Sequence, residues 1–355
     1  MTVTELRCRN FRNLEDITLV PCDGVNVVYG ENAQGKTNLM EAVWLFSGMK
    51  SFRGAKDAEL ISHGKEFAKL SLKFRTDARE NTATLTVTNK RAAELNGVKL
   101  PSAPSLIGKF SAVVFAPSFL SIIEDGPAER RKFADTAVCQ LKPAYAGLLA
   151  EYNRVLKQRN SLLKDVIMES SLLDLLDILD GKLCETGERI TAARRAYLEQ
   201  SAPTAEKIYA GLSGGREAVG FQYLCKYEGK MADALRAARR EDILNRATSV
   251  GPHRDDIEIL LDGLSVRAYG SQGQKRSCAV ALKLTEAEIL KAETGEQPVI
   301  ILDDVMSELD VSRQDYILNH IKDRQVFITC CEPGPALRAA SGMRIEIKNG
   351  KIVEK

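Results

Sequence analysis

The sequence has almost no net charge, no cysteine pair of the zinc-binding kind and no long apolar run. Its 50 lysines and arginines nearly cancel its 48 aspartates and glutamates, which leaves a formal charge of +2. Overall charge therefore does not indicate a nucleic-acid-binding protein, and any basic patch has to be local. None of the 8 cysteines belongs to a C-x-x-C pair, which argues against a structural zinc site.

The sequence also has no pattern for export, membrane insertion or a long coiled coil. Its first residues contain no apolar signal core. No uninterrupted apolar run approaches the ~18 residues that a membrane-spanning helix needs. No heptad repeat is long enough for an extended coiled coil. We therefore expect a cytoplasmic protein that has no membrane contact and keeps its thiols reduced.

The hydrophobic pattern is α/β at both ends of the chain and helical in the middle. Val25–Tyr29, Val299–Leu302 and Val326–Thr329 are short apolar runs, as in buried parallel strands. From about residue 120 to 240 the pattern is helical, and five leucines between 172 and 183 recur at helical spacing. Helix breakers such as Pro143, Pro203 and Gly214-Gly215 are sparse and local in this stretch.

Two Asn-Gly pairs predict tight turns. Asn96-Gly97 follows an alternating segment in the first third of the chain, and Asn349-Gly350 lies between Ile347 and Ile352. Because Asn and Gly tolerate the positive φ angles of a two-residue hairpin, the second pair predicts a terminal β-hairpin. The length of 355 residues suggests about two domains of roughly 150 residues each.

A glycine-rich loop is the first motif that carries chemistry. Gly30–Thr37, with the sequence GENAQGKT, fits the pattern G-x-x-x-x-G-K-S/T, between an apolar strand and an apolar helix. Such a loop aims backbone N–H groups at a phosphate, and the following helix presents its positive end. Lys36 is placed to reach the β- and γ-phosphates, and Thr37 supplies a hydroxyl for Mg²⁺. The candidate nucleotide-binding residues are Gly30, Glu31, Asn32, Ala33, Gln34, Gly35, Lys36 and Thr37.

An apolar strand that ends in two acids forms the second motif. Ile300-Ile301-Leu302 runs directly into Asp303-Asp304, which resembles a Walker B strand. We expect Asp303 to hold Mg²⁺, directly or through water. Asp304 occupies the position where many ABC ATPases carry a glutamate that polarises the attacking water, so it is the candidate catalytic residue.

Two further segments resemble motifs of ABC-type ATPases. Ser271-Gln272-Gly273 opens the sequence SQGQKR, which resembles the ABC signature and places Ser271, Gln272 and Gly273 as γ-phosphate contacts at a helix N-terminus. Ser307-Glu308-Leu309-Asp310 follows the Walker B segment and matches a D-loop. Each segment by itself is also compatible with an ordinary helix N-cap.

The chain resembles the RecF family over most of its length, from about Val3 to Val353. The phosphate loop and the Walker B segment identify only the superfamily. More specific are the segments FRN at 11–13, SFR at 51–53, YNR at 152–154 and GPHRDD at 251–256. The resemblance implies an α/β fold of the ABC-ATPase head type, with a compact α-helical lid inserted and no long coiled coil. It further implies an N-terminal head part at 1–117, a lid at 118–245 and a C-terminal head part at 246–355.

The same resemblance implies a function in DNA repair. The resemblance implies an ATP-dependent homodimer in which each phosphate loop is closed by the partner's signature. It predicts ATP and Mg²⁺ as cofactors, binding of double-stranded and gapped DNA, and direct cooperation with RecR. RecO and RecA are expected as indirect partners, because the family helps to load RecA. A weak DNA-dependent ATPase activity would reset the dimer.

The sequence departs from related patterns at two places, and the role of a third residue, His253, needs separate consideration. Phe115-Ala116-Pro117 is followed by Ser118-Phe119, where RecF proteins usually carry acidic residues. Cys330-Cys331 stands near the position where many ABC ATPases have a switch histidine, so no switch residue is assigned. His253 lies in a Gly-Pro turn, where a structural role is favoured over direct catalysis.

Two other classes of ATP-binding protein remain as alternatives. A transporter ATPase subunit would carry a Q-loop glutamine and a switch histidine, and neither is found. A nucleotide-gated structural protein of the SMC type would need long heptad arms, which are also missing. A metabolic P-loop kinase is disfavoured by the signature-like and D-loop-like segments.

Overall fold

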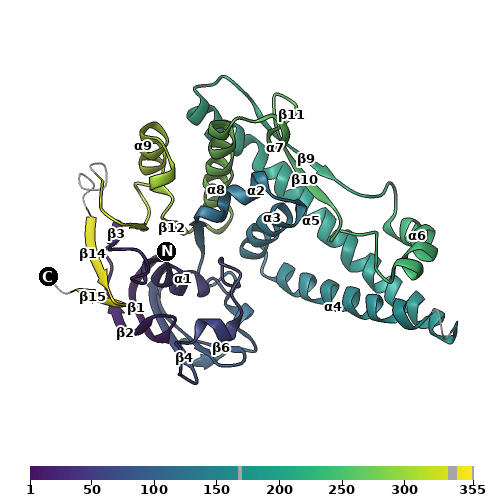
Figure 1. The fold of residues 1–355 in the computed structure, drawn as a ribbon, viewed down its shortest axis with the longest axis horizontal. Coiled ribbons are helices and arrows are strands. Elements are labelled where there is room, and N and C mark those ends of the chain that lie inside the picture. The colour runs from purple at the N-terminus through teal and green to yellow at the C-terminus, as the bar shows by residue number, and fades with distance from the viewer. Residues whose placement is uncertain (167–169, 335–341, 354–355) are drawn as a thin grey trace. The chain divides into compact units, whose positions relative to one another are not determined.

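The chain forms two compact units, called here the sheet unit and the helical unit (Figure 1). The structure, a computed structural model, describes residues 1–166, 170–334 and 342–353. The sheet unit comprises Met1–Leu120, Lys207–Arg216 and Gln272–Lys355. The helical unit comprises Ser121–Glu206 and Glu217–Ser271.

The limits of these units differ from the predicted domain boundaries. The predicted boundaries follow residues 117 and 245, whereas the units change at Leu120 and at Ser271, and Lys207–Arg216 belongs to the sheet unit. The segment from 246 to 271, expected in the C-terminal head part, therefore lies in the helical unit. That the two units act as an ATPase head and its lid stays a prediction.

A six-stranded, mostly parallel sheet with the order β15-β14-β3-β13-β12-β8 forms one layer of the sheet unit. The strands predicted from apolar runs are confirmed, and every residue of β8, β12 and β13 is buried, as expected for a parallel sheet covered on both faces. The strands are β3 (Val25–Tyr29), β8 (Ala112–Phe115), β12 (Val299–Asp303), β13 (Val326–Cys330), β14 (Gly342–Lys348) and β15 (Lys351–Val353).

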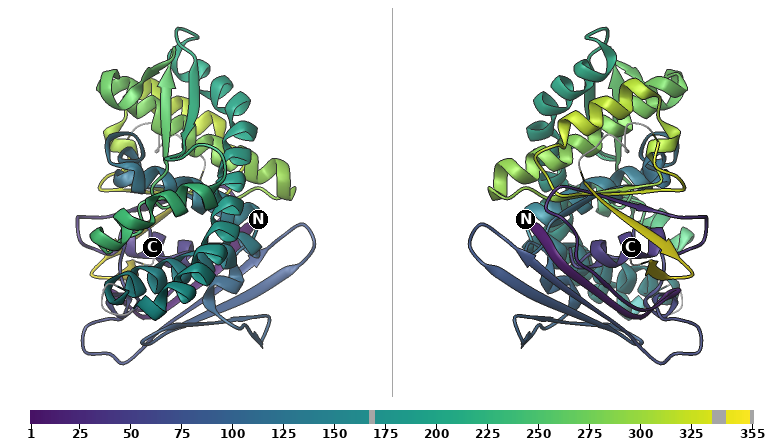
Figure 2. Two further views of the ribbon diagram at one scale, coloured as in Figure 1. Left: turned by 90° about the vertical axis from the view of Figure 1, so that its right-hand side faces the viewer. Right: turned by 90° about the vertical axis from the view of Figure 1, so that its left-hand side faces the viewer.

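An antiparallel sheet with the order β2-β1-β4-β5-β6-β7 forms a second layer of the sheet unit, drawn in purple and blue in Figure 2. Buried and exposed residues alternate along β4, because successive side chains of a strand point to opposite faces. Leu6 pairs with Leu72 and Leu70 with Leu85 in the fully buried core. The strands are β1 (Thr2–Phe11), β2 (Leu14–Leu19), β4 (Ala68–Arg75), β5 (Glu80–Val87), β6 (Arg91–Leu95) and β7 (Val98–Lys99).

Helices of the sheet unit complete its core. Helix α1 buries Leu39, Met40 and Trp44 in the same apolar cluster as the strand residues of both sheets. The longer helices are α1 (Lys36–Leu45), α8 (Gln272–Thr294) and α9 (Val311–His320). Short 3-10 turns are η1 (Asp57–Leu60), η2 (Ala103–Leu106), η3 (Pro117–Leu120) and η5 (Met306–Glu308).

Helices dominate the helical unit, and one predicted break is wrong. Pro203 lies inside α5, whereas Gly214 and Gly215 follow the end of that helix with positive φ angles of 71° and 73°. The elements are α2 (Ser121–Glu124), α3 (Pro127–Leu141), α4 (Ala144–Asp165), η4 (Ser170–Leu172), α5 (Leu173–Ser213), α6 (Met231–Asn245) and α7 (Val266–Tyr269). No helix among the described residues is long and apolar enough to span a bilayer.

A small sheet in the helical unit corrects the prediction of an all-helical middle region. Strand β9 (Val219–Leu224) pairs with β10 (Asp256–Leu261), and β11 (Leu264–Ser265) completes the order β11-β10-β9. Val219 lies opposite Leu261, and Phe221 lies opposite Ile259. Strand β9 is stabilised by a partner more than 30 residues away, which local periodicity does not report.

Candidate functional site

The glycine-rich loop lies between the end of β3 and the start of α1. Gly30 and Gly35 adopt positive φ angles of 150° and 113°, and Gly35 is the N-cap of α1. A Cβ at Gly30 would lie 2.3 Å from the Ile347 carbonyl oxygen, and one at Gly35 would lie 2.8 Å from a methyl group of Leu14. Glycine is therefore required at both positions, for conformation and for space.

The side chain of Lys36 folds back into this loop. Its Nζ donates hydrogen bonds to the carbonyl oxygens of Gly30 at 2.6 Å and of Glu31 at 2.8 Å, and the residue is only 7% exposed. Glu31, Asn32 and Ala33 are exposed on the surface of the loop. Both oxygen partners of this ammonium group are therefore neutral carbonyls, which provide no counter-charge.

Asp303 and Thr37 lie side by side at the end of β12. The Thr37 hydroxyl donates to Asp303 Oδ1 at 3.0 Å, and the Thr329 hydroxyl donates to the same oxygen at 2.8 Å. Burial raises the pKa of Asp303, while the bonds from Thr329 and Thr37 lower it. A desolvated carboxylate beside a hydroxyl is a set of oxygen ligands that suits Mg²⁺, so these residues fit the predicted metal.

Thr329 is a site residue that sequence reasoning missed. It lies in β13, whose parallel register sets Asp303 opposite Thr329. Its hydroxyl also accepts the backbone N–H of Asp304 at 2.8 Å, which holds Asp304 at a positive φ of 55°. The only signal in the sequence is a polar residue near the end of an otherwise apolar run. Its partner could not be identified without the strand order.

The signature-like segment forms a second group, at the start of α8. Helix α8 begins at Gln272, directly after Ser271. The Arg313 side chain on α9 donates to the Gly273 carbonyl oxygen at 3.0 Å and to the Ser277 hydroxyl at 2.8 Å. Sequence reasoning missed Arg313, which joins the signature-like and D-loop-like segments.

The D-loop-like segment ends in a helix cap. The Asp310 carboxylate accepts the Arg313 backbone N–H at 3.0 Å at the start of α9. It also forms an ion pair with the Arg313 guanidinium. The capping alternative therefore holds for Asp310 in this structure, and a role at a subunit interface remains compatible with it.

The FRN and SFR segments surround the helix that follows the phosphate loop. Glu41 of α1 is completely buried and accepts two hydrogen bonds from Arg12, at 2.9 Å and 3.1 Å. The Ser51 hydroxyl donates to the same carboxylate. This buried bridge fixes α1 against both segments.

A polar chain of three side chains continues toward the loop. Arg53 donates to the Asn38 side-chain oxygen at 2.9 Å, and Asn38 donates to the Asn13 side-chain oxygen at 2.7 Å. The positive charge of Arg53 is also one of the influences that lower the pKa of Asp303. The two segments thus reach the candidate site through Asn13 and Arg53.

Cys331 lies directly beside the phosphate loop. Its carbonyl oxygen accepts the Gly30 N–H at 3.3 Å, and its thiol contacts the Asn32 side-chain oxygen at 3.1 Å. The thiol is 4.0 Å from Lys36 Nζ. No role was predicted for Cys331, because the expected switch residue of an ABC ATPase is a histidine and none is present near this position.

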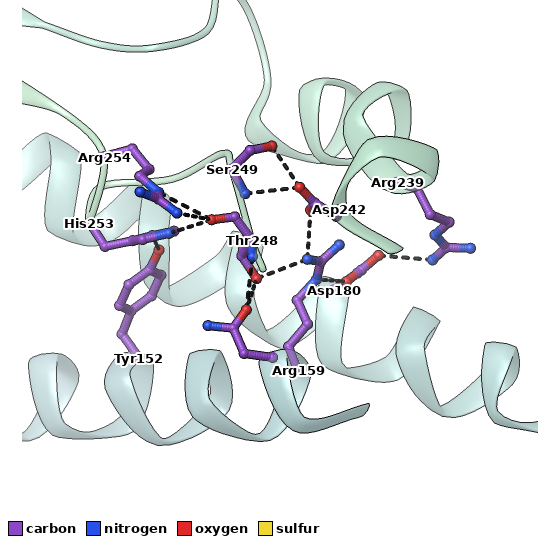
Figure 3. A network of polar contacts seen from close by, with 10 residues as sticks. Tyr152, Arg159, Asp180, Arg239, Asp242, Thr248, Ser249, His253 and Arg254 are labelled. Atoms are coloured by element: carbon purple, nitrogen blue, oxygen red, sulfur yellow. Dashed lines mark hydrogen bonds and ion pairs between the residues drawn. The ribbon is translucent and has the colours of Figure 1, made fainter. Parts of the chain in front are cut away.

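The GPHRDD segment belongs to a polar network in the helical unit (Figure 3). His253 pairs through Nδ1 with the Tyr152 hydroxyl at 2.6 Å and through Nε2 with the Thr248 carbonyl oxygen at 3.1 Å. In the same network, the fully buried Arg159 donates to Asp180 at 2.6 Å and to Asp242 at 2.7 Å. These contacts agree with a structural role for His253 in its turn.

Comparison with known proteins gives consistent results over the whole chain. The family model described as "RecF/RecN/SMC N terminal domain" matches residues 2–353. The "DNA replication and repair protein RecF" of Acetivibrio thermocellus is 38% identical over 94% of each chain. The protein of the same name from Agathobacter rectalis is 39% identical over 93% of this chain and 92% of its own.

Solved structures agree in fold. The structure of "the recombination mediator protein RecF-ATP in RecFOR pathway" matches with a TM-score of 0.92 at 38% identity, over 100% of this chain and 97% of that one. An SMC head bound to the C-terminal winged-helix domain of ScpA matches with a TM-score of 0.59 at 15% identity. The second likeness concerns the fold alone and extends it to the SMC-head class.

Proposed function

The chain belongs to the RecF family, and on this basis we propose that it is an ATP-dependent DNA-binding protein of recombinational repair and replication restart. The observation that carries the proposal is the geometry of the phosphate loop. The buried Lys36 donates hydrogen bonds to backbone carbonyl oxygens of the loop, and the next residue, Thr37, is hydrogen-bonded to Asp303. A solved relative is described as RecF with ATP in the RecFOR pathway, which supports ATP as the ligand.

Each residue of the loop has a proposed part in nucleotide binding. Backbone N–H groups of residues 30–37 surround the phosphates, and Lys36 neutralises the β- and γ-phosphates. Thr37 and Asp303 would hold Mg²⁺, which neutralises phosphate charge when bound. Asp304 orients the attacking water in a slow, DNA-dependent hydrolysis.

The signature-like residues are proposed to act in trans. In an ATP-driven homodimer, Ser271, Gln272 and Gly273 of one subunit contact the γ-phosphate held by the other. Arg313 supports this assignment, because it fixes the backbone of Gly273 through its carbonyl oxygen. The dimer binds double-stranded DNA near gaps, cooperates with RecR and RecO in loading RecA, and separates after hydrolysis.

Titration calorimetry with ATP tests the nucleotide site. Lys36→Met removes a charge-assisted bond of ~1.5–3 kcal/mol, so ATP binding should weaken by roughly one to two orders of magnitude. Lys90→Met, at an exposed lysine of the same unit, serves as the matched control and should bind like wild type. Equal affinity in wild type and Lys36→Met would remove the assignment of the loop.

Salt-dependent DNA binding tests the remainder of the proposal. Each neutralised phosphate adds about −0.9 to the slope of log affinity against log salt. Dimerisation doubles the phosphate contacts, so ATP or a non-hydrolysable analogue should steepen the slope about twofold. Fluorescence anisotropy with duplex DNA measures this, and Lys36→Met should lack the response. Identical affinity and slope with and without nucleotide would contradict an ATP-gated DNA clamp.

A further inference from the structure

The outer side of the phosphate loop is held by the turn between β14 and β15. The Gly350 N–H donates to the Gln34 carbonyl oxygen at 3.0 Å. The Asn349 N–H donates to the side-chain oxygen of the same glutamine. Gln34, predicted to contact nucleotide, thus directs its amide oxygen to this turn, and its backbone carbonyl is bound there as well.

The turn fits between the loop and the FRN segment with no free space. A Cβ at Gly350 would lie 2.1 Å from the Asn13 carbonyl oxygen, and Gly350 has a positive φ of 70°. Three residues before Gly350, in β14, the Ile347 carbonyl oxygen packs against Gly30. The β14–β15 hairpin therefore contacts the loop at both its first glycine and its fifth residue.

Asn13 holds the neighbouring peptide of the loop. Its side-chain amide donates to the Ala33 carbonyl oxygen at 3.1 Å. Ala33 has a positive φ of 64°, a conformation that costs an L-residue about 1–2 kcal/mol and persists only when its surroundings enforce it. The bond from Asn13 and the bonds from the turn supply that constraint.

These contacts orient the groups that would bind phosphate. In a planar trans peptide the C=O and the following N–H point in opposite directions. Because Asn13 holds the Ala33 carbonyl and Gly350 holds the Gln34 carbonyl, the N–H groups of Gln34 and Gly35 face the other side of the chain. An anion bound in the loop on that side would meet N–H groups that are already oriented.

We infer that the Asn349-Gly350 turn is a positioning element that fixes the shape of the phosphate loop and thereby sets the affinity for ATP. The inference rests on the proposed function, because it concerns the same nucleotide. Preorganised donors bind an anion better than donors that must be ordered on binding, so loosening this turn weakens the nucleotide. ATP and ADP should be affected alike, because both carry the phosphates next to the loop.

A second Asn-Gly turn in the sheet unit provides a matched control. Asn96 and Gly97 have φ angles of 52° and 78°, close to the 50° and 70° of Asn349 and Gly350. A Cβ at Gly97 meets nothing within 4 Å, whereas one at Gly350 collides with Asn13. Gly97→Ala therefore carries the same backbone strain without disturbing the phosphate loop.

Calorimetry with ATP and with ADP on the full chain tests the inference. Gly350→Ala should weaken both nucleotides about tenfold, equivalent to about 1.4 kcal/mol, whereas Gly97→Ala should bind within about twofold of wild type. Thermal melting without nucleotide checks that both variants are folded. Gln34→Ala leaves the turn sequence intact, removes only the side-chain acceptor and should weaken both nucleotides about threefold.

The outcomes separate this inference from the proposed function. If Lys36→Met weakens ATP binding as predicted, but Gly350→Ala and Gln34→Ala bind like wild type, the positioning role is wrong and the ATP site stands. Equal weakening by Gly350→Ala and Gly97→Ala would also overturn the inference, because general strain would then explain the effect. If wild type fails to bind ATP, both proposals fail.

Discussion

Two polar clusters, one around Lys36 in the sheet unit and one around Arg159 in the helical unit, contain similar residue types in opposite arrangements. Lys36 contacts neutral carbonyl oxygens, and within the described residues it has no carboxylate partner. Arg159 is completely buried between the carboxylates of Asp180 and Asp242. The charge of Arg159 is neutralised by anions of the fold, whereas the carbonyl oxygens that hold Lys36 carry no counter-charge. Within one chain, the comparison separates a charge that the fold pairs from one that the proposed nucleotide site would use.

The largest expected effect concerns stability of the helical unit. Arg159→Met leaves the wholly buried Asp242 without its cation, and breaking such a pair costs about 3–5 kcal/mol in the free energy of unfolding. Arg154→Met, on the same helix α4, removes an exposed pair with Glu151 at 4.0 Å and should cost at most about 1 kcal/mol. Urea unfolding followed by circular dichroism measures both values. Similar losses in the two variants would break the comparison, because burial would then not distinguish the pairs.

The fold was predictable where the signal was local. Apolar runs located β3, β12 and β13, since strands of a parallel sheet are buried on both faces. Asn349-Gly350 located the final hairpin because both residues tolerate the positive φ angles of a tight turn. Strand β9 was missed because its partner β10 is far along the chain. A helix break was predicted at Pro203, but α5 continues through this residue.

The candidate site divides in the same way. Residues 30–37 could be predicted because all parts of the loop are contiguous in sequence. The roles of Thr329 and Gly350 could not be predicted. Thr329 lies beside Asp303 only because β12 and β13 are neighbours, and Gly350 reaches the loop from a turn more than 300 residues away in the chain. Arg313 was missed because its side chain joins two segments about 40 residues apart. Sequence motifs therefore locate the contiguous loop proposed to bind the nucleotide, but not the distant groups that hold that loop in place.

A smaller effect is expected from pH at His253, in the network of the helical unit. Burial is the main cause that lowers the pKa of His253 to about 4; the Thr248 carbonyl raises it, Arg254 and Arg131 lower it, and Asp255 raises it. The ordinary histidine pKa is about 6.5. Between these values the unfolded chain binds a proton that the folded protein does not. Stability from this group is therefore complete above about pH 6.5 and is lost as the pH falls toward about 4.

The pH dependence can be isolated by comparing variants across a series of urea unfolding curves. Half of the unfolded histidine is already protonated at pH 6.5, so wild type should lose about 1 kcal/mol more than His253→Gln between pH 6.5 and 5.5. His63→Gln, at an exposed histidine of the sheet unit, should keep the wild-type slope. If His253→Gln also keeps the wild-type slope, His253 is not shielded from protonation in its network. The contrast between the two clusters would then rest on the buried ion pairs of Arg159 alone. If only His253→Gln flattens the dependence of the free energy of unfolding on pH, the result supports a structural role for the GPHRDD segment in the helical unit. A histidine with such a low pKa is unsuited to exchange protons near neutral pH, which argues against a catalytic role.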